Sequence, residues 1–526
     1  MPSSPAHLTK ARGSVFCIRP LKEDWSAGSK VSTWASRFTS NSSTPTSSAV
    51  SSTSRATDAA LMSNRGLPKH KVHKRAVKHG RKLSLWRLSA YVGASLGALV
   101  LAGAVLIFLF GGAILDSYGK RKAEREFAEA HPGYALRIGE LDYAVGANRL
   151  VAQSVTLSAT NTTLKVGRIS LTGVHWARFL WGTAALADVL AKASLEATNL
   201  DVEFAQAHYG IRCERLRASV PGSELIAEGT ELRTLAGDED FFATRYYRTV
   251  RFHVVVPECK VLGLAYGELF QGKSYRARSV HFSGPSFEAL VNRDKPPKPF
   301  VKSPLMVHEA LAAIRHPLQV DSLSITNGHF EYCERLAVGA DPAVLTFGAV
   351  SLFVEGIANR GEATAAIQLR GQGDLMNAGT MKVGMTIPIQ PPDFSLHYSG
   401  SLSAMDLTRL DAFLEIAEHT RIKSGSAHEA SFEIDVTAGQ ARGRVRAIYR
   451  DLEMAVLDKQ SGTEKGFDNR VTSFLMNALK FRNSNAPDAS GSMKEGEVKY
   501  TRRPDDEFQQ FAWFALRTGV LDVISQ

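Results

Sequence analysis

The sequence predicts a mainly β protein, with curled antiparallel sheets in two related β-rich halves and a few helices. One transmembrane helix and a disordered N-terminal arm are expected to precede the sheets. Three observations predict this fold: an uncharged run between Arg87 and Asp116, apolar alternation at period two, and an apolar pattern that recurs along the chain. With 526 residues, 44% of them hydrophobic, the chain can build a sizeable core.

The N-terminal arm, residues 1–87, is expected to be disordered and cytoplasmic. Residues 39–55 contain little besides Ser, Thr and Ala, so few large side chains are available for burial. Much of the net charge of +11 lies in a basic block over residues 65–87. Such a block is typical of a juxtamembrane segment held on anionic lipid, and we favour that interpretation over nucleic-acid binding.

Residues 88–115 are predicted to form a single transmembrane helix. The run carries no charge, and a helix of that length reaches roughly 40 Å, more than the hydrocarbon core of about 30 Å. A buried core helix would be shorter and amphipathic, and a cleaved signal peptide would lie closer to the N-terminus. The expected anchor residues are Trp86, Tyr91, Leu101, Ile107, Phe108, Leu109, Phe110 and Leu115. The flank before the run is the more basic one, which predicts a cytoplasmic N-terminus.

The rest of the chain is divided into a juxtamembrane helix over 116–131, a first β module over 132–300 and a second β module over 301–526 with a C-terminal helix. Alternation at period two places apolar side chains on one face of a strand. The strands that show it most plainly contain Met381, Val383, Met385, Ile387 and Ile389, then Phe432, Ile434 and Val436, then Val445, Ala447 and Tyr449.

A second pattern has two apolar pairs separated by two residues rather than one. A flat strand would place the two pairs on opposite faces, so a bulge or bend is expected at the double spacer. The pattern occurs at Leu136/Ile138/Leu141/Tyr143, Leu164/Val166/Ile169/Leu171, Leu195/Ala197/Leu200/Val202, Tyr275/Ala277/Val280/Phe282, Leu318/Val320/Leu323/Ile325 and Leu345/Phe347/Val350/Leu352.

Two of these units repeat at nearly the same long offset. The segment from Leu136 to Gly146 matches the segment from Leu318 to Gly328, and residues 164–171 match residues 345–352. This favours a duplication whose halves meet near the Pro-rich stretch at 294–300. The alternative is that unrelated β meanders share such patterns.

Parts of the second module resemble AsmA-like proteins. The residues that carry the resemblance are 393–407, 410–414, 422–434, 443–452 and 494–526, which include Phe394, Leu396, Gly443, Gly496 and Trp513. The resemblance covers roughly residues 88–526, is weak over 205–300, and contains no catalytic motif. It implies a periplasmic domain anchored in the inner (cytoplasmic) membrane of a Gram-negative cell, with an apolar β groove that shields acyl chains.

The resemblance therefore implies lipid handling or transfer, or envelope (outer membrane) biogenesis, with membrane lipids and, as an open alternative, other envelope proteins as partners. The competing interpretation is a non-enzymatic scaffold with a closed core. Residues expected to line the groove are Met381, Val383, Met385, Ile387, Ile389, Phe394, Leu396, Phe432, Ile434, Val436, Val445 and Tyr449. We expect no enzymatic activity, no cofactor, no metal and no nucleic-acid partner.

One motif argues for different chemistry. Residues 267–274 match the phosphate-binding spacing G-x4-G-K-[ST], which requires a helix directly afterwards. The residues that follow fit the strand pattern, so Gly267 and Gly272 are interpreted as turn residues. The four cysteines have no metal-binding spacing; a bridge between Cys213 and Cys259 and buried free thiols are both open.

Overall fold

One continuous β-sheet forms most of the structure. The computed structural model describes residues 117–175, 186–296, 299, 303–362, 365–389, 391, 393–457, 481–504 and 506–525. Over these ranges the chain is mainly β, with nineteen strands in one sheet and a few helices, which confirms the predicted class. The strands are β1 (Tyr134–Arg137), β2 (Glu140–Ala144), β3 (Arg149–Ala159), β4 (Thr162–Thr172), β5 (Ser194–Phe204), β6 (Tyr209–Ser219), β7 (Glu224–Thr234), β8 (Val250–Leu262), β9 (Tyr275–Ser283), β10 (Ser286–Asn292), β11 (Leu318–Arg335), β12 (Ala343–Ala358), β13 (Ala366–Leu375), β14 (Gly379–Pro388), β15 (Leu396–Leu402), β16 (Met405–Asp406), β17 (Thr420–Thr437), β18 (Gln440–Val456) and β19 (Glu495–Thr501).

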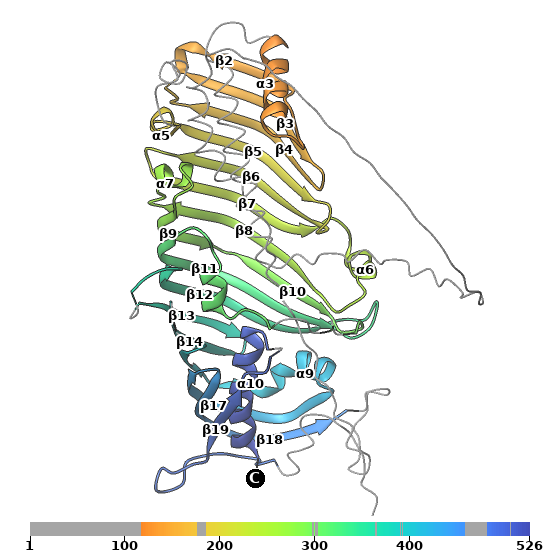
Figure 1. Ribbon diagram of the computed structural model, residues 1–526. Coiled ribbons are helices and arrows are strands. Elements are labelled where there is room, and N and C mark those ends of the chain that lie inside the picture. The colour runs from red at the N-terminus through yellow and green to blue at the C-terminus, as the bar shows by residue number, and fades with distance from the viewer. Residues whose placement is uncertain are drawn as a thin grey trace, which may run out of the picture.

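The helices lie at the ends and margins of this sheet (Figure 1). The α-helices are α3 (Ser117–Ala130), α5 (Leu186–Val189), α6 (Asp238–Ala243), α7 (Tyr266–Phe270), α8 (Val307–Ala312), α9 (Asp411–Ala417) and α10 (Phe508–Ile524), and the short 3-10 turns are η1 (Val145–Ala147) and η2 (Leu407–Leu410). The helix α3 coincides with the helix expected over 116–131.

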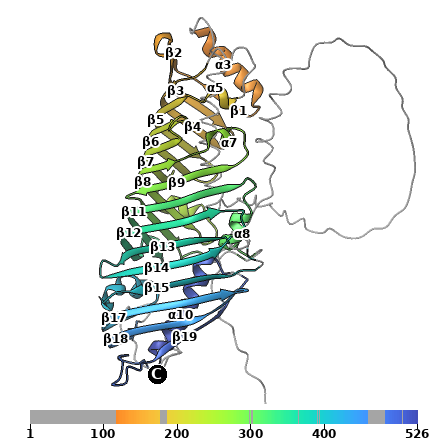
Figure 2. The same ribbon diagram turned by 90° about the vertical axis from the view of Figure 1, so that its left-hand side faces the viewer.

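Neighbours in the sheet are nearly always neighbours in the sequence. Strands β3 to β8 pair antiparallel in order, as do β11 to β15 and β17 to β19. The short β1 and β2 both pair with β3, and β17 follows β15. The result is a long ladder of strands that runs from α3 at one end to α10 at the other (Figures 1 and 2).

A parallel pairing joins the two predicted modules. β9 and β10 lie one after the other between β8 and β11. Both pair antiparallel with β8 in the same register, and both pair parallel with β11 in the same register. A parallel neighbour requires a crossover connection, and residues 293–317 with α8 supply it. The sheet therefore continues without interruption past the predicted boundary at residue 300.

The two sequence matches behind the predicted duplication occupy different places in the strand order. The first match aligns β1 and β2 with β11, and each of these opens its part of the ladder. The second match aligns β4 with β12, although β3 lies between β2 and β4 while β12 follows β11 directly. The duplication stays a prediction.

A line of irregular residues crosses the sheet from β3 to β12, and we call it the break line. From β3 to β8 the ladder skips one residue in each strand at this line, and β3, β5 and β7 adopt a positive φ there. The line continues through Gly284, between β9 and β10, to Asn327 of β11 and Ala349 of β12, which also have positive φ. Its members are Ser154 (φ 52°), Gly167, Asn199 (φ 53°), Glu214, Gly229 (φ 61°), Pro257, Gly284 (φ 60°), Asn327 (φ 53°) and Ala349 (φ 47°).

The breaks explain the double spacers of the sequence. In β5 the positive φ of Asn199 resets the alternation, so Ala197 and Leu200 are buried on the same face, 0% and 7% exposed. In all six double-spacer units the strand pairing is interrupted at the spacer. Some of these interruptions belong to the break line, and others to a second set of skipped residues such as Arg278 and Asp321. The expected bulge or bend is confirmed.

Both edges of the sheet are covered by helices. At the first edge the backbone N–H of Ile138 donates to Glu124 Oε1 at 2.8 Å, and Lys120 Nζ donates to the Gly139 carbonyl at 2.8 Å, both from α3. At the last edge two N–H groups of β19, at Glu497 and Lys499, donate to Asp522 Oδ2 at 2.8 Å and Thr518 Oγ1 at 3.2 Å of α10. Unpaired edge groups invite pairing with another chain, and these side chains occupy several of them.

The sheet carries a large hydrophobic cluster at each end. The first gathers the inward residues of β1 to β6 with Phe127 of α3 and Phe242 of α6. The second lies between α10 and strands β15 to β19, with Phe511 and Ile434 fully buried. In this second cluster Gly496 and Gly519 bring strand and helix into backbone contact, because a Cβ on Gly496 would lie 1.9 Å from the Gly519 carbonyl oxygen.

The predicted membrane anchor is not borne out. Residues 1–116, including the expected arm and residues 88–115 with their anchor side chains, lie outside the described residues. Within the described part no helix is long and apolar enough to cross a membrane. The longest of those helices, α10, has 17 residues, and α3 is charged throughout. This corrects the predicted localisation: a single-pass inner-membrane protein with a cytoplasmic N-terminus and a periplasmic domain has no support in the structure.

Replacing Ala349 by glycine should stabilise the fold. The positive φ of Ala349 is unfavourable for an L-residue by about 1–2 kcal/mol, which outweighs the entropy cost of glycine, about 0.5–1 kcal/mol. We expect the free energy of unfolding in urea to rise by about 0.5–1 kcal/mol. The matched control is Ala366→Gly in β13, where φ is not positive. It should lower the same quantity, and a common sign for both variants would contradict the strain at Ala349.

Gly496→Ala should destabilise the C-terminal end of the sheet. The new methyl group would force α10 away from β19, and overpacking of this kind costs about 1–3 kcal/mol. The measurement is the urea midpoint, together with the rate of proteolysis in α10. As a control, Gly267→Ala places its methyl group where no atom lies within 4 Å. Equal stability of the two variants would show that α10 does not pack as described.

Candidate functional site

A row of apolar residues and glycines crosses the sheet on the face that α10 covers. Each residue is the direct cross-strand partner of the next, so the row follows the long axis of the ladder. We call it the apolar row: Leu141, Ala152, Ile169, Ala197, Leu216, Ala227, Cys259, Phe282, Ile325, Leu352, Gly371, Val383, Gly400, Phe432, Val445 and Gly496. Neighbouring strands lie about 4.8 Å apart, so the row extends over roughly 70 Å of sheet.

The row is covered near its ends and accessible in its middle. Ala152 and Ala197 near the start, and Val445 near the end, are at most 3% exposed. Leu216 is also buried, but the nine residues that follow it are only half-buried, and we call them the open segment: Ala227, Cys259, Phe282, Ile325, Leu352, Gly371, Val383, Gly400 and Phe432. At about 4.8 Å per strand this segment covers roughly 40 Å.

Aromatic side chains widen the apolar surface beside the open segment. Phe287, Phe330 and Phe347 are successive cross-strand partners on the same face. The rings of Phe287 and Phe330 lie 5.8 Å apart, and Phe252 stands 5.7 Å from Phe287. All four are half-buried, so this line adds accessible aromatic area next to the row.

Glycines flatten one part of the open segment. A Cβ on Gly371 would come within 3.0 Å of Leu352 Cδ1, and a Cβ on Gly400 within 2.6 Å of the Phe432 ring. The large side chains therefore lean over the glycines of the next strand. This produces a low, continuous apolar surface rather than isolated side chains.

The residues expected to line a groove fall into two groups. Eight are at most 7% exposed and belong to the hydrophobic clusters: Ile387, Ile389, Phe394, Leu396, Ile434, Val436, Val445 and Tyr449. Burial also raises the pKa of the Tyr449 hydroxyl to about 12. The other four, Met381, Val383, Met385 and Phe432, are half-buried on the apolar face. Only the second group is accessible to a ligand in this conformation.

Sequence reasoning missed the accessible part of the face in β8 to β12. Phe282, Ile325 and Leu352 were recognised as members of strand units but not as candidate ligand contacts. The alignment of Phe282 with Ile325 could have been found by placing the double spacers of β9 and β11 side by side, because the skipped residues Arg278 and Asp321 lie level in the two strands.

The phosphate-binding motif has the wrong surroundings for a nucleotide site. The helix α7 ends within the motif, Gly272 forms a turn with φ 62°, and β9 begins directly after Ser274. The Ser274 hydroxyl and Arg276 both donate to the Glu268 carboxylate. A P-loop needs the N-terminus of a helix at this point, and a strand begins here instead. The turn interpretation is confirmed for Gly272 and wrong for Gly267, which lies within α7. Within the described chain no cluster of His, Cys, Asp or Glu could hold a metal ion.

The cysteines of the described residues are free thiols. Cys213 lies on β6 and Cys259 on β8, with β7 between them, a separation of about two strand spacings that no disulfide bridges. Burial raises the pKa of Cys213, and it raises the pKa of Cys259 to about 11 and that of Cys333 to about 12.

No protein family matches the sequence, and no curated protein matches it. The resemblance to AsmA-like proteins stays a prediction from the residues.

The three thiols should alkylate slowly in the folded protein at pH 8. The thiolate is the reacting species, and a raised pKa lowers its fraction, to about one in a thousand for Cys259. Iodoacetamide labelling of each cysteine peptide, read by mass spectrometry, should accelerate as the pH rises toward 11 and on unfolding in urea. Rapid labelling of Cys259 at pH 8 would contradict its raised pKa.

Proposed function

We propose that this protein binds the acyl chains of lipids on the open segment and handles or transfers them along the apolar row. The observation that carries the proposal is the continuous half-buried apolar surface from Ala227 to Phe432. Large accessible apolar patches on folded proteins are typical of ligand or membrane contact. An extended chain lying across the strands would meet an apolar side chain or glycine on every strand.

The binding energy would come from removal of apolar surface from water. At about 25 cal/mol per Å², each buried methylene of a chain contributes about 0.8 kcal/mol. The glycines Gly371 and Gly400 leave the surface low where Leu352 and Phe432 lean over them. Such a surface contacts a chain along its length without selecting one chain length.

The resemblance of residues 393–452 to AsmA-like proteins supports lipid handling in particular. Kinship with that family and the origin of the two halves by duplication belong to this proposal. The parallel pairing of β9 and β10 with β11 supports the duplication, because the chain begins a second antiparallel meander at β11.

A scaffold without a ligand is the second candidate. The observation that favours it is the closed cluster beneath α10, which contains residues expected to line a groove, such as Ile434 and Val436. A full-length protein that purifies free of lipid and takes up none from vesicles would favour the scaffold.

Leu352→Asp should abolish most of the lipid binding. A carboxylate at the centre of the open segment would have to lose its hydration under an acyl chain, so we expect binding to fall at least about tenfold, or 1.4 kcal/mol. The measurement is uptake of a fluorescent phospholipid from vesicles by the full chain, together with mass spectrometry of co-purified lipid. Val383→Asp, two strands away, should act in the same way.

The matched control is Ser351→Asp. It adds the same charge to the neighbouring residue of β12, whose side chain points to the opposite face. Uptake should stay within about twofold of the original chain. Equal losses for Leu352→Asp and Ser351→Asp, with melting temperatures unchanged, would show that the apolar face is not the binding surface.

A further inference from the structure

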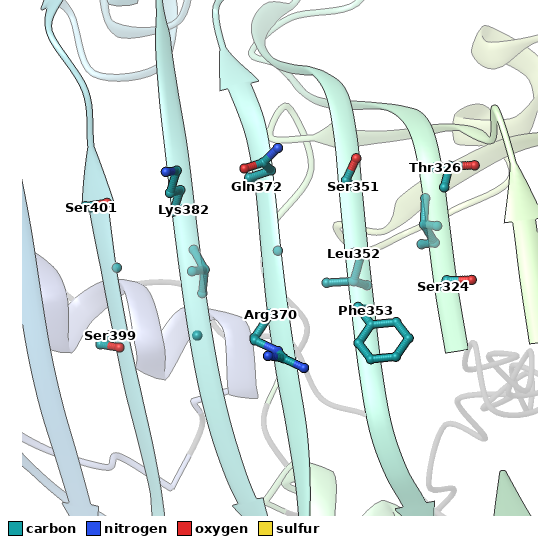
Figure 3. Close-up of a pocket in the computed structure, with 15 residues that line it drawn as sticks. Ser324, Thr326, Ser351, Leu352, Phe353, Arg370, Gln372, Lys382, Ser399 and Ser401 are labelled. Carbon is teal, nitrogen blue, oxygen red and sulfur yellow. The ribbon is translucent and has the colours of Figure 1, made fainter. Parts of the chain in front are cut away.

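The opposite face of the sheet carries a hollow of about 750 Å³ over β11 to β15. Figure 3 shows two rows of side chains that cross these strands, one through Ser351, Gln372 and Lys382, the other through Phe353 and Arg370. Successive residues of a strand alternate between faces, so these side chains lie on the side away from Ile325, Leu352 and Val383. Five residues of the open segment also line the hollow and lie between the two rows: Ile325, Leu352, Gly371, Val383 and Gly400.

Polar and cationic side chains line this hollow together with Ile325, Leu352, Val383 and Phe353. Its polar side chains are hydroxyls, one amide and two cations: Ser324, Thr326, Ser351, Arg370, Gln372, Lys382, Ser399 and Ser401. None of the lining residues carries a carboxylate. Among the described residues Lys382 has no ion pair, while Arg370 contacts Glu355 at 2.8 Å from outside the lining. The charge of the hollow complements an anion.

The floor of the hollow is backbone, and among its glycines only Gly384 lies in the row of Arg370 and Ser399, whose side chains point to this face. Gly371, Gly384 and Gly400 expose backbone there, and Ser399 and Ser401 flank them. Phe353, 38% exposed, stands at one side, and the Arg370 guanidinium lies 5.8 Å from its ring centre. The long axis crosses five strands, about 19 Å at 4.8 Å per step.

The recognition must be made by side chains. Strands β12 to β14 pair on both sides, so their backbone N–H and C=O groups are used within the sheet. A peptide that adds as a strand needs a free edge, which this place does not offer. Hydroxyls at regular spacing, an exposed ring and two cations instead suit a chain of sugar rings that carries acidic groups.

We infer that this hollow binds an acidic oligosaccharide, laid across β11 to β15 with its carboxylates on Lys382 and Arg370 and a sugar ring against Phe353. The hydroxyl and amide groups of the row through Ser351 and Gln372 hydrogen-bond its hydroxyls. The side chains that make these contacts point away from those of Ile325, Leu352 and Val383, although the same strands carry both surfaces.

The test is titration calorimetry of the full chain with tetragalacturonate, with neutral maltotetraose and inorganic sulfate as comparison ligands. Tetragalacturonate should bind, maltotetraose should bind at least about tenfold more weakly, and sulfate should not compete at equal concentration. Lys382→Glu and Arg370→Gln should each weaken tetragalacturonate binding about tenfold, the effect of losing one charge-assisted contact of about 1.4 kcal/mol.

Arg444→Glu is the matched control, because Arg444 lies on the same face of β18 and is 78% exposed. It should change the affinity less than twofold. The inference is overturned if tetragalacturonate does not bind, if maltotetraose or sulfate binds equally well, or if Arg444→Glu weakens binding as much as Lys382→Glu. Phospholipid uptake should be unaffected by Lys382→Glu, which separates this site from the open segment.

Discussion

The rest of the structure depends on one constraint, the alignment of a skipped residue in successive strands from β3 to β12. A single positive φ in a strand would merely move its side chains to the other face. Because the breaks at Asn199 and Gly229 lie level with the skipped residues of the strands beside them, the strands from β3 to β8 all switch at the same place. One face of the sheet thereby stays apolar on both sides of the line.

The sheet separates two kinds of chemistry by the thickness of a single layer. Ile325, Leu352 and Val383 present carbon on one side, and the residues next to them present hydroxyls and cations on the other. No loop or domain boundary is needed to keep the two surfaces apart, since alternation along the strand does so. A lipid and a charged glycan could occupy the same five strands without contact.

Sequence patterns predicted the mainly β class, the bends at the double spacers and the absence of a P-loop helix after Ser274, because each of these is encoded within ten residues. Sequence patterns did not predict the parallel pairing of β9 and β10 with β11, because that pairing depends on the path of the connection between β10 and β11. Burial of Ile434 and Val436 was missed because alternation identifies an apolar face but not what covers it. Here α10 does, through the backbone contact of Gly496 with Gly519.

The helices at the two edges give the ladder a property usually associated with repeat proteins. α3 and α10 act as terminal caps: α3 contacts the first strands, and α10 packs on β15 to β19 at the other end. The strands between them pair with their neighbours alone, so strand pairs could be inserted or deleted without altering either cap. The length of the apolar row could then change during evolution through the number of hairpins between the two capped ends.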